Sequence, residues 1–303
     1  MERGGGAVDR GLDRQPRQAR EALEVRAAAV NPFDAKSYSG TMGTDESRLP
    51  KPLGLEASGV VTAIGDDAVG PSGPLAVGDE VVVYPLTGGY AEAVTVPATS
   101  VFGKPPSLSW EQAAGMTLTG VTAYHLVEAT AVHAGDTVLV HGVGGSVGLS
   151  TAQLALARGA TVIGTAAEHR HESLRGYGII PVVYGDGLAD RVRAAAPGGV
   201  DVALDTVGTD EAVDVSLALV PGDRIASIAA FGRGDTGIRL LGSGPGADPG
   251  TELRSRARLE IADLAGRGDL DVVVARVFPL AEVVEAYRLV IGGHAGGKVV
   301  LVP

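Results

Sequence analysis

The segment that most constrains the fold of this chain is an apolar strand, a glycine-rich turn and a helix in direct succession. The strand is expected at residues 137–141, the glycines Gly142, Gly145 and Gly148 follow, and the helix is expected to begin at Ser146. Glycine permits a tight turn and lets a diphosphate approach the backbone, while a helix N-terminus favours negative charge. About one such glycine triplet is expected by chance among the 45 glycines of this chain, so the flanking strand and helix carry the prediction of a dinucleotide site.

Strands and helices alternate from this segment onward. An earlier helix is marked by Ser109 and Gln112, which have the spacing of a capping box. Repeated β-α units are typical of a doubly wound parallel sheet, so we expect the α/β class. The predicted strands are 137–141, 161–165, 200–205 and 224–230, and the predicted helices begin at Ser146, Glu168 and Asp210.

The first third of the chain has a different pattern of short strands separated by glycine, proline and aspartate clusters, which is typical of a small barrel or sandwich. A last strand, helix and strand at 272–303 are expected to rejoin it. We therefore expect a β domain at 21–118 and 269–303 and a cofactor domain at 119–268. Residues 1–20 are expected to be a disordered or atypical leader, and glycines concentrate in a predicted loop at 232–251.

Charge and composition exclude several classes of function. The net charge of −11 argues against a nucleic-acid partner and gives no support for binding to anionic lipid. Cysteine is absent, which excludes disulfides, thiolate nucleophiles and cysteine-containing zinc sites. The N-terminal segment lacks the apolar core of a signal peptide, so we expect a cytoplasmic protein.

The end of the second predicted strand bears on the choice between NADPH and NADH. An NAD site usually carries an acidic residue there, but this strand ends at Thr165 with two alanines after it. Arg170, and His169 with it, are expected to hold a 2′-phosphate, since guanidinium groups suit phosphate oxygens. Glu168 would instead reach a ribose if the turn were shifted, and a solvated helix start is the other alternative.

Several short blocks occur together in the order found in a known family. They include 54–61, 77–81, 88–92, 120–124, 199–208 and 296–301, besides the glycine turn. Over residues 21–303 the chain resembles the zinc-free quinone oxidoreductase branch of the medium-chain dehydrogenase/reductase superfamily. The departure lies at residues 1–20, where the family has barrel strands and this chain shows no strand pattern, so the first barrel strands are expected to be missing or replaced.

The resemblance implies a GroES-like barrel packed against a Rossmann domain, NADPH as cofactor, no zinc, and a homodimer in which the strand at 224–230 is a candidate for edge-to-edge pairing. A small-molecule quinone or enone is the implied substrate. Asn31 and Thr122 are expected near the nicotinamide, although Asn31 would equally cap the turn before Pro32. The full set expected to bind the cofactor is Asn31, Thr122, Gly142, Gly144, Gly145, Ser146, Val147, Gly148, Thr165, His169, Arg170 and Tyr184.

The catalytic residues are less constrained by the sequence. Asn31, Lys36 and Tyr38 are the candidates, and water is an alternative proton donor.

Tyr184 is either beside the adenosine phosphate or a strand-end aromatic that fills a gap. Four functions remain open: an NADPH:quinone reductase, an enoyl reductase acting on alkenals or acyl thioesters, a non-catalytic NADPH-binding redox sensor, and a structural or interaction module with a decayed nucleotide site.

Overall fold

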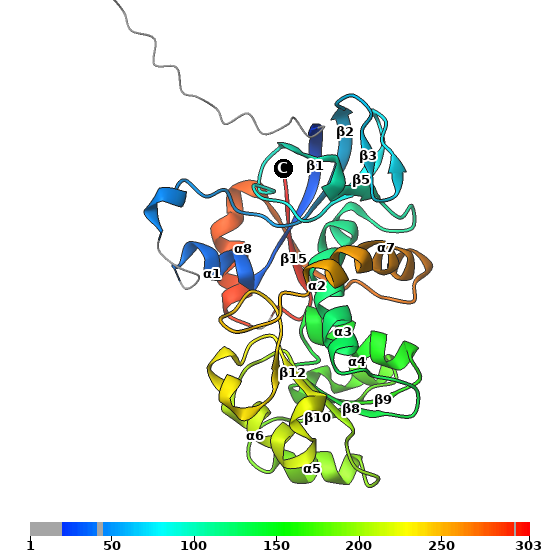
Figure 1. Ribbon diagram of the computed structural model, residues 1–303, viewed down its shortest axis with the longest axis vertical. Coiled ribbons are helices and arrows are strands. Elements are labelled where there is room, and N and C mark those ends of the chain that lie inside the picture. Colours follow the sequence, from blue (N-terminus) through cyan, green and yellow to red (C-terminus); the bar gives the residue numbers. More distant parts are fainter. Residues whose placement is uncertain (1–19, 41–44, 294) are drawn as a thin grey trace, which may run out of the picture.

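The protein consists of two β-sheets at opposite ends of the molecule with a long helix, α2 (Trp110–Ala129), between them (Figure 1). The computed structural model describes residues 20–40, 45–293 and 295–303. All but the last residue of the predicted leader therefore lies outside the described residues. In the part of the chain that is described, no helix combines the length and hydropathy needed to cross a membrane.

The first sheet is built from both ends of the described chain. Its order is β14-β15-β1-β2-β5-β7, and β6 also pairs with β1. The last strand runs antiparallel to the first, with Val30 opposite Val299. The strands are β1 (Arg20–Val30), β2 (Ala57–Ala63), β5 (Glu80–Val83), β6 (Ala93–Pro97), β7 (Val101–Gly103), β14 (Val274–Pro279) and β15 (Lys298–Val302), beside a small hairpin of β3 (Val69–Gly70) and β4 (Gly73–Pro74).

The second sheet is parallel and has the order β10-β9-β8-β11-β12-β13, which is the Rossmann arrangement. Its strands are β8 (Thr137–His141), β9 (Thr161–Thr165), β10 (Ile180–Val182), β11 (Val202–Asp205), β12 (Ile225–Ser227) and β13 (Arg239–Leu240). Two of these match the predicted ranges 137–141 and 161–165. We propose domain boundaries near residues 118 and 269, as predicted, since all strands of this sheet lie between them.

Two predictions for this region need correction. The strand predicted at 224–230 is shorter and lies between β11 and β13, so it is not available for edge-to-edge pairing. The segment 232–251, predicted as a loop, contributes the edge strand β13 instead. Short strands escape notice because a two-residue strand has no periodicity.

The helices pack around these sheets and define where the chain turns. They are α1 (Pro32–Tyr38), α3 (Ser146–Ala157), α4 (His171–Gly176), α5 (Leu188–Ala195), α6 (Asp210–Leu219), α7 (Thr251–Arg267) and α8 (Val283–Ile291), besides α2. The predicted capping box is present in α2, where Gln112 N donates to Ser109 Oγ over 3.2 Å and Ser109 N to the Gln112 side chain over 3.1 Å. The helix predicted from Glu168 begins as a 3₁₀ turn, η3 (Glu168–Arg170), before α4.

The core of the molecule continues through α2. Phe102 of the first sheet, Met116 of α2 and Val140 of the second sheet belong to one cluster of buried apolar residues. Because α2 is buried on most sides, it has no pronounced apolar stripe. The two sheets are thereby joined by packing as well as by the chain.

Candidate functional site

A cavity of about 610 Å³ lies between the two sheets, and this volume is typical of ligand sites. Its wall is formed by the first turn of α3, the ends of β9 and β11, the start of α1 and the turn before β15. The predicted site residues on the wall are Asn31, Lys36, Gly142, Gly144, Gly145, Ser146, Val147, Gly148, Thr165, His169, Arg170 and Tyr184. Sequence positions from Asn31 to Tyr184 are thus brought together.

The glycine turn leaves the N-terminus of α3 open to this cavity. Gly142 has φ +77°, and a Cβ atom on Gly148 would lie 2.2 Å from the carbonyl oxygen of Gly142. Gly142 N donates to Thr165 Oγ1 over 3.0 Å, which ties the turn to β9. The N-cap residue is Gly145, and no side chain caps the helix. The first N–H groups of α3 can therefore bind an anion, as a dinucleotide site requires.

Arg170 faces the same cavity from η3. Its Nη2 donates to the carbonyl oxygen of Gly296 over 3.1 Å, which links the Rossmann sheet to the turn before β15. Its buried Nε atom has no hydrogen-bond partner among the described residues. His169 is also on the wall, whereas His171 is buried with its Nε2 beside the carbonyl oxygen of Ala166. Because this Nε atom is itself buried, a ligand in the cavity would have to bind the other guanidinium nitrogens of Arg170.

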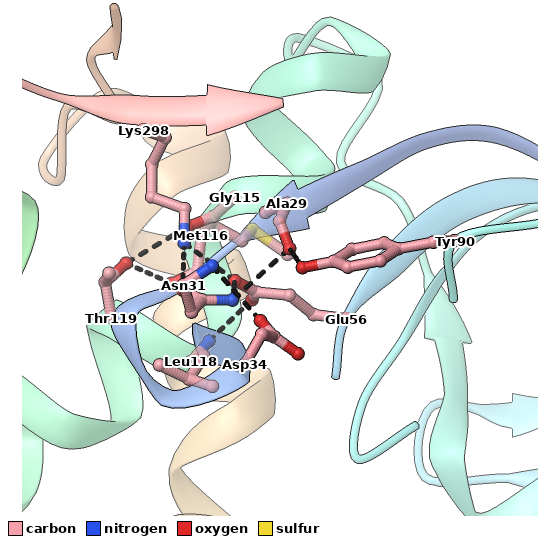
Figure 2. A network of polar contacts seen from close by, with 10 residues as sticks. All are labelled: Ala29, Asn31, Asp34, Glu56, Tyr90, Gly115, Met116, Leu118, Thr119 and Lys298. Carbon is pink, nitrogen blue, oxygen red and sulfur yellow. Dashed lines mark hydrogen bonds and ion pairs between the residues drawn. The ribbon is translucent and has the colours of Figure 1, made fainter. Parts of the chain in front are cut away.

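A buried polar network forms the other end of the wall (Figure 2). Lys298 Nζ donates to Glu56 Oε1 over 2.8 Å and to Asn31 Oδ1 over 2.6 Å. Asn31 Nδ2 donates to Glu56 Oε1 over 3.2 Å. The Glu56 and Lys298 side chains are 0% and 3% exposed, so neither charge is compensated by bulk water. The pair and the Asn31 amide therefore satisfy one another and fix the orientation of that amide.

The network also joins the helices on both sides of the cavity. Glu56 Oε2 accepts a hydrogen bond from Leu118 N over 2.7 Å, within α2. Asp34, in the first turn of α1, accepts from Asn31 N and Gly54 N, each over 3.1 Å. Burial raises the pKa of Asp34 above its usual value. Asp34 thereby holds the Asn31 backbone at the start of α1, whereas the Asn31 side chain makes no cap hydrogen bond and turns to Glu56 and Lys298.

The structure places two of the predicted residues away from the wall. Thr122 is buried in α2, and Leu118 and Thr119, one turn earlier, line the cavity instead. Tyr38 is 53% exposed and packs edge-to-face on Tyr287, with ring centroids 5.1 Å apart. Lys36, by contrast, lies on the wall.

The neighbouring tyrosines are held in their neutral form. Tyr90 donates to the carbonyl oxygen of Ala29 over 3.4 Å, and burial raises the pKa of Tyr90 far above its ordinary value. Burial also raises the pKa of Tyr287 to about 12. Neither ring lies among the wall residues of the described chain.

His141, which ends β8, is a wall residue that sequence reasoning did not assign. Its Nε2 lies 3.1 Å from Ser216 Oγ, whose hydroxyl donates to the carbonyl oxygen of Ala212 over 2.7 Å. The ring must therefore donate through Nε2. Burial lowers the pKa of His141 to about 4, against the opposing influence of Asp205, so the ring is neutral near pH 7.

Lys298, Glu56, Thr119 and Glu211 are further wall or network residues that were not singled out as site residues. Lys298 and Glu56 did leave a signal, since each is a lone charge within an apolar stretch and the two have opposite signs. Thr119 and Glu211 left none, because a threonine in a helix and a glutamate near a helix start are common on ordinary surfaces.

The comparisons with family models cover most of the chain in two pieces. Residues 19–134 match the alcohol dehydrogenase GroES-like domain, and residues 177–301 match the zinc-binding dehydrogenase family. The first match confirms the predicted GroES-like domain. The zinc named in the second description does not fit the donors present here: the sequence has no cysteine, Leu55 precedes Glu56, and Glu56 is already neutralised by Lys298. The described residues contain no group of histidine, aspartate and glutamate side chains suited to a metal.

The relatives include quinone oxidoreductases and a much longer protein of a polyketide synthase system. Human quinone oxidoreductase is 28% identical over 94% of this chain and 90% of its own length. The spectinabilin polyketide synthase system protein NorB of Streptomyces orinoci is 32% identical over 94% of this chain, which spans only 13% of that protein.

Solved structures share the fold over nearly the whole chain. The Escherichia coli quinone oxidoreductase complexed with NADPH has a TM-score of 0.78 at 25% identity, covering 96% of this chain and 95% of that one. The CurK enoyl reductase has a TM-score of 0.78 at 26% identity, covering 93% and 90% of the two chains.

Proposed function

Since this chain belongs to the medium-chain dehydrogenase/reductase superfamily of oxidoreductases, we propose that it reduces a quinone or an activated enone with NADPH and without a metal. The observation that carries this proposal is a single cavity that runs from the uncapped N-terminus of α3 to the Asn31–Glu56–Lys298 network. One end of the cavity provides backbone N–H donors for a diphosphate. The other end holds the fixed Asn31 amide and the Lys298 ammonium, beside the position that we propose for the reacting groups. When bound, the reduced nicotinamide would supply the hydride.

The protein's own groups would bind and orient the two reactants. The N–H groups of the first turn of α3 hold the diphosphate, and Arg170, His169 and Tyr184 hold the adenosine end. Asn31 is kept in one orientation by Lys298 and Glu56, so its contacts are preorganised rather than formed during the reaction.

Proton delivery is proposed to occur at the mouth of the cavity. Lys36 lies on the wall and is exposed to solvent, so it is the proposed donor at the acceptor end. Tyr38 contacts Tyr287 rather than the wall, and we propose that any effect it has on catalysis passes through the packing of α1 on α8. Thr122 is buried in α2 one turn after Thr119 and is not a wall residue, so we propose that any effect it has on the nicotinamide is indirect.

NADPH is proposed over NADH because Arg170 lies on the cavity wall just after β9, with a cationic guanidinium group that makes a hydrogen bond only to Gly296 among the described residues. Glu168 is exposed and is not a wall residue, which disfavours the alternative in which it binds a ribose. A 2′-phosphate would accept from the guanidinium group and replace its contact to Gly296.

The test is oxidation of NADPH with 1,4-benzoquinone, phenanthrenequinone or a short enone, followed by the loss of reduced-nicotinamide absorbance, with NADH as the control. We expect turnover with at least one acceptor and preference for NADPH. Tight binding of NADPH without turnover of any acceptor would instead favour the redox sensor, and no binding at all would refute the dinucleotide site.

A second candidate is an enoyl reductase acting on alkenals or acyl thioesters. Its specific support is the likeness to the CurK enoyl reductase and the match to a polyketide synthase protein. An enoyl thioester reduced faster than every quinone would establish this candidate.

The homodimer stays a prediction, for which the edge strand β13 replaces the strand at 224–230 as the pairing element.

A further inference from the structure

One carboxylate on the cavity wall has no place in the proposed binding of phosphates. Glu211 lies in the first turn of α6, on the wall between Thr209 and Ala212. A carboxylate repels phosphate, so it must face a part of the ligand that is uncharged and donates hydrogen bonds. Two of its neighbours, Asp210 and Asp214, are paired with Arg233, whereas Glu211 has no ion-pair partner among the described residues.

One oxygen of Glu211 is fixed and the other is free to accept. Gly185 N donates to Oε2 over 3.1 Å, which holds the carboxylate against the loop that follows β10. Oε1 accepts no hydrogen bond from the residues that the structure describes. The side chain is therefore anchored on one side and retains an acceptor on the other.

The surroundings of Glu211 suit a flat aromatic ring. Tyr184 and Val207 are 53% and 48% exposed, and both lie on the cavity wall, from the loops after β10 and β11. Large apolar side chains left exposed in a ligand cavity are expected to be covered by the ligand. Aromatic rings and aliphatic side chains provide favourable contacts to the faces of such a ring.

The position of this region along the cavity identifies the ring. With the diphosphate at the N-terminus of α3 and the ribose at the end of β9, the nucleotide continues toward the loops after β10 and β11. The part of the ligand that reaches Tyr184, Val207 and Glu211 is then the adenine base. The 6-amino group of adenine is an uncharged donor, as the free oxygen of Glu211 requires.

We infer that Glu211 selects adenine by accepting a hydrogen bond from its 6-amino group. This inference rests on the proposed function, because it assumes that a dinucleotide occupies the cavity. It adds a residue that distinguishes one base from another, at the opposite end of the cavity from the reaction. A base with an oxygen at position 6 would place two acceptors together and bind more weakly.

The experiment compares equilibrium binding of NADPH and its deamino analogue, in which hypoxanthine replaces adenine and all other groups are identical. We expect the wild-type protein to bind NADPH at least about tenfold more tightly, which corresponds to about 1.4 kcal/mol. In Glu211→Gln the side-chain oxygen can still accept from Gly185 N, and the amide nitrogen then faces the base as a donor, which suits an oxo group and not an amino group. The preference for NADPH should therefore be lost or reversed.

The matched control is Glu172→Gln, which removes the same charge from an exposed position on α4 and should leave the ratio unchanged. Equal binding of the two nucleotides by the wild-type protein would overturn the inference while leaving the proposed function in place. An unchanged ratio in Glu211→Gln, with both nucleotides weakened equally, would also overturn it and would indicate contact with the ribose. If the wild-type protein binds neither nucleotide, the proposed function and this inference both fail.

Discussion

Replacement of Lys298 by methionine tests whether the buried network holds the two ends of the described chain together. Methionine retains most of the volume of the side chain but removes the ammonium. Glu56, which is 0% exposed, would keep its hydrogen bonds from Asn31 and Leu118 but lose the one cation that pairs with it among the described residues. Breaking a buried pair in this way costs about 3–5 kcal/mol, because one uncompensated charge remains.

The free energy of unfolding is the quantity to measure, by urea titration followed through the fluorescence of Trp110. This is the only tryptophan in the sequence, and its carbonyl oxygen accepts from Ser58 of the first sheet over 2.7 Å. We expect Lys298→Met to lose about 3–5 kcal/mol, equivalent to a fall in Tm on the order of 10 °C.

Two further variants make this prediction refutable. Arg193→Met removes one partner of an exposed pair, Arg193 with Asp190, and should cost no more than about 1 kcal/mol. The double variant Lys298→Met with Glu56→Gln removes both charges and should recover much of the lost stability. A loss below about 1 kcal/mol in Lys298→Met, or no recovery in the double variant, would refute the reasoning from buried charge.

Three further predictions concern the cavity. Gly148→Ala places a Cβ atom 2.2 Å from a backbone oxygen, so it should lower the free energy of unfolding by roughly 3 kcal/mol and weaken nucleotide binding. Gly176→Ala, with nothing within 4 Å of the added Cβ atom, should do neither. Melting and binding curves test both variants. Arg170→Ala should raise the Kd for NADPH about 10–100-fold and leave that for NADH nearly unchanged; equal effects on both would contradict the assignment. The pKa of His141 is about 4 in the folded protein and 6.5 in the unfolded chain, so the unfolded chain binds a proton at higher pH than the folded protein does. The free energy of unfolding therefore falls as the pH drops from 6.5 to about 4. In His141→Gln, roughly 3 kcal/mol of this pH-dependent loss in the free energy of unfolding should disappear. If unfolding titrations at several pH values give the same dependence on pH for both proteins, the ring is not buried in its neutral form.

The parts of the molecule that the sequence predicted well are those set by neighbouring residues. The turn at Gly142 follows from an apolar strand and three glycines, and the start of α2 follows from Ser109 and Gln112. The domain order followed instead from the family resemblance and from the change of pattern after the first third of the chain. By contrast, α7 was overlooked although it ends at Gly268, a typical C-cap glycine with φ +81°.

The candidate site was predictable only where it is local in the sequence. Glu56 and Lys298 are 242 residues apart, so no pattern of spacing connects them; they meet because β1 pairs with β2 on one side and with β15 on the other. The exposure of Tyr184, and the presence of Thr119 rather than Thr122 on the cavity wall, depend on how the loops and α2 pack. Such packing is decided by tertiary structure rather than by the identity of neighbouring residues.

The position of β15 in the first sheet has a consequence for the order of folding during synthesis. This strand is translated after every strand of the Rossmann sheet, yet it pairs with β1 and supplies the cation for Glu56. Until it emerges from the ribosome, the edge of β1 from Ala28 to Val30 has no partner and the Glu56 carboxylate has no counter-ion. The Rossmann unit can therefore fold while the first domain is still incomplete, which reverses the usual N-terminal-first order and leaves an exposed strand edge for chaperones to bind.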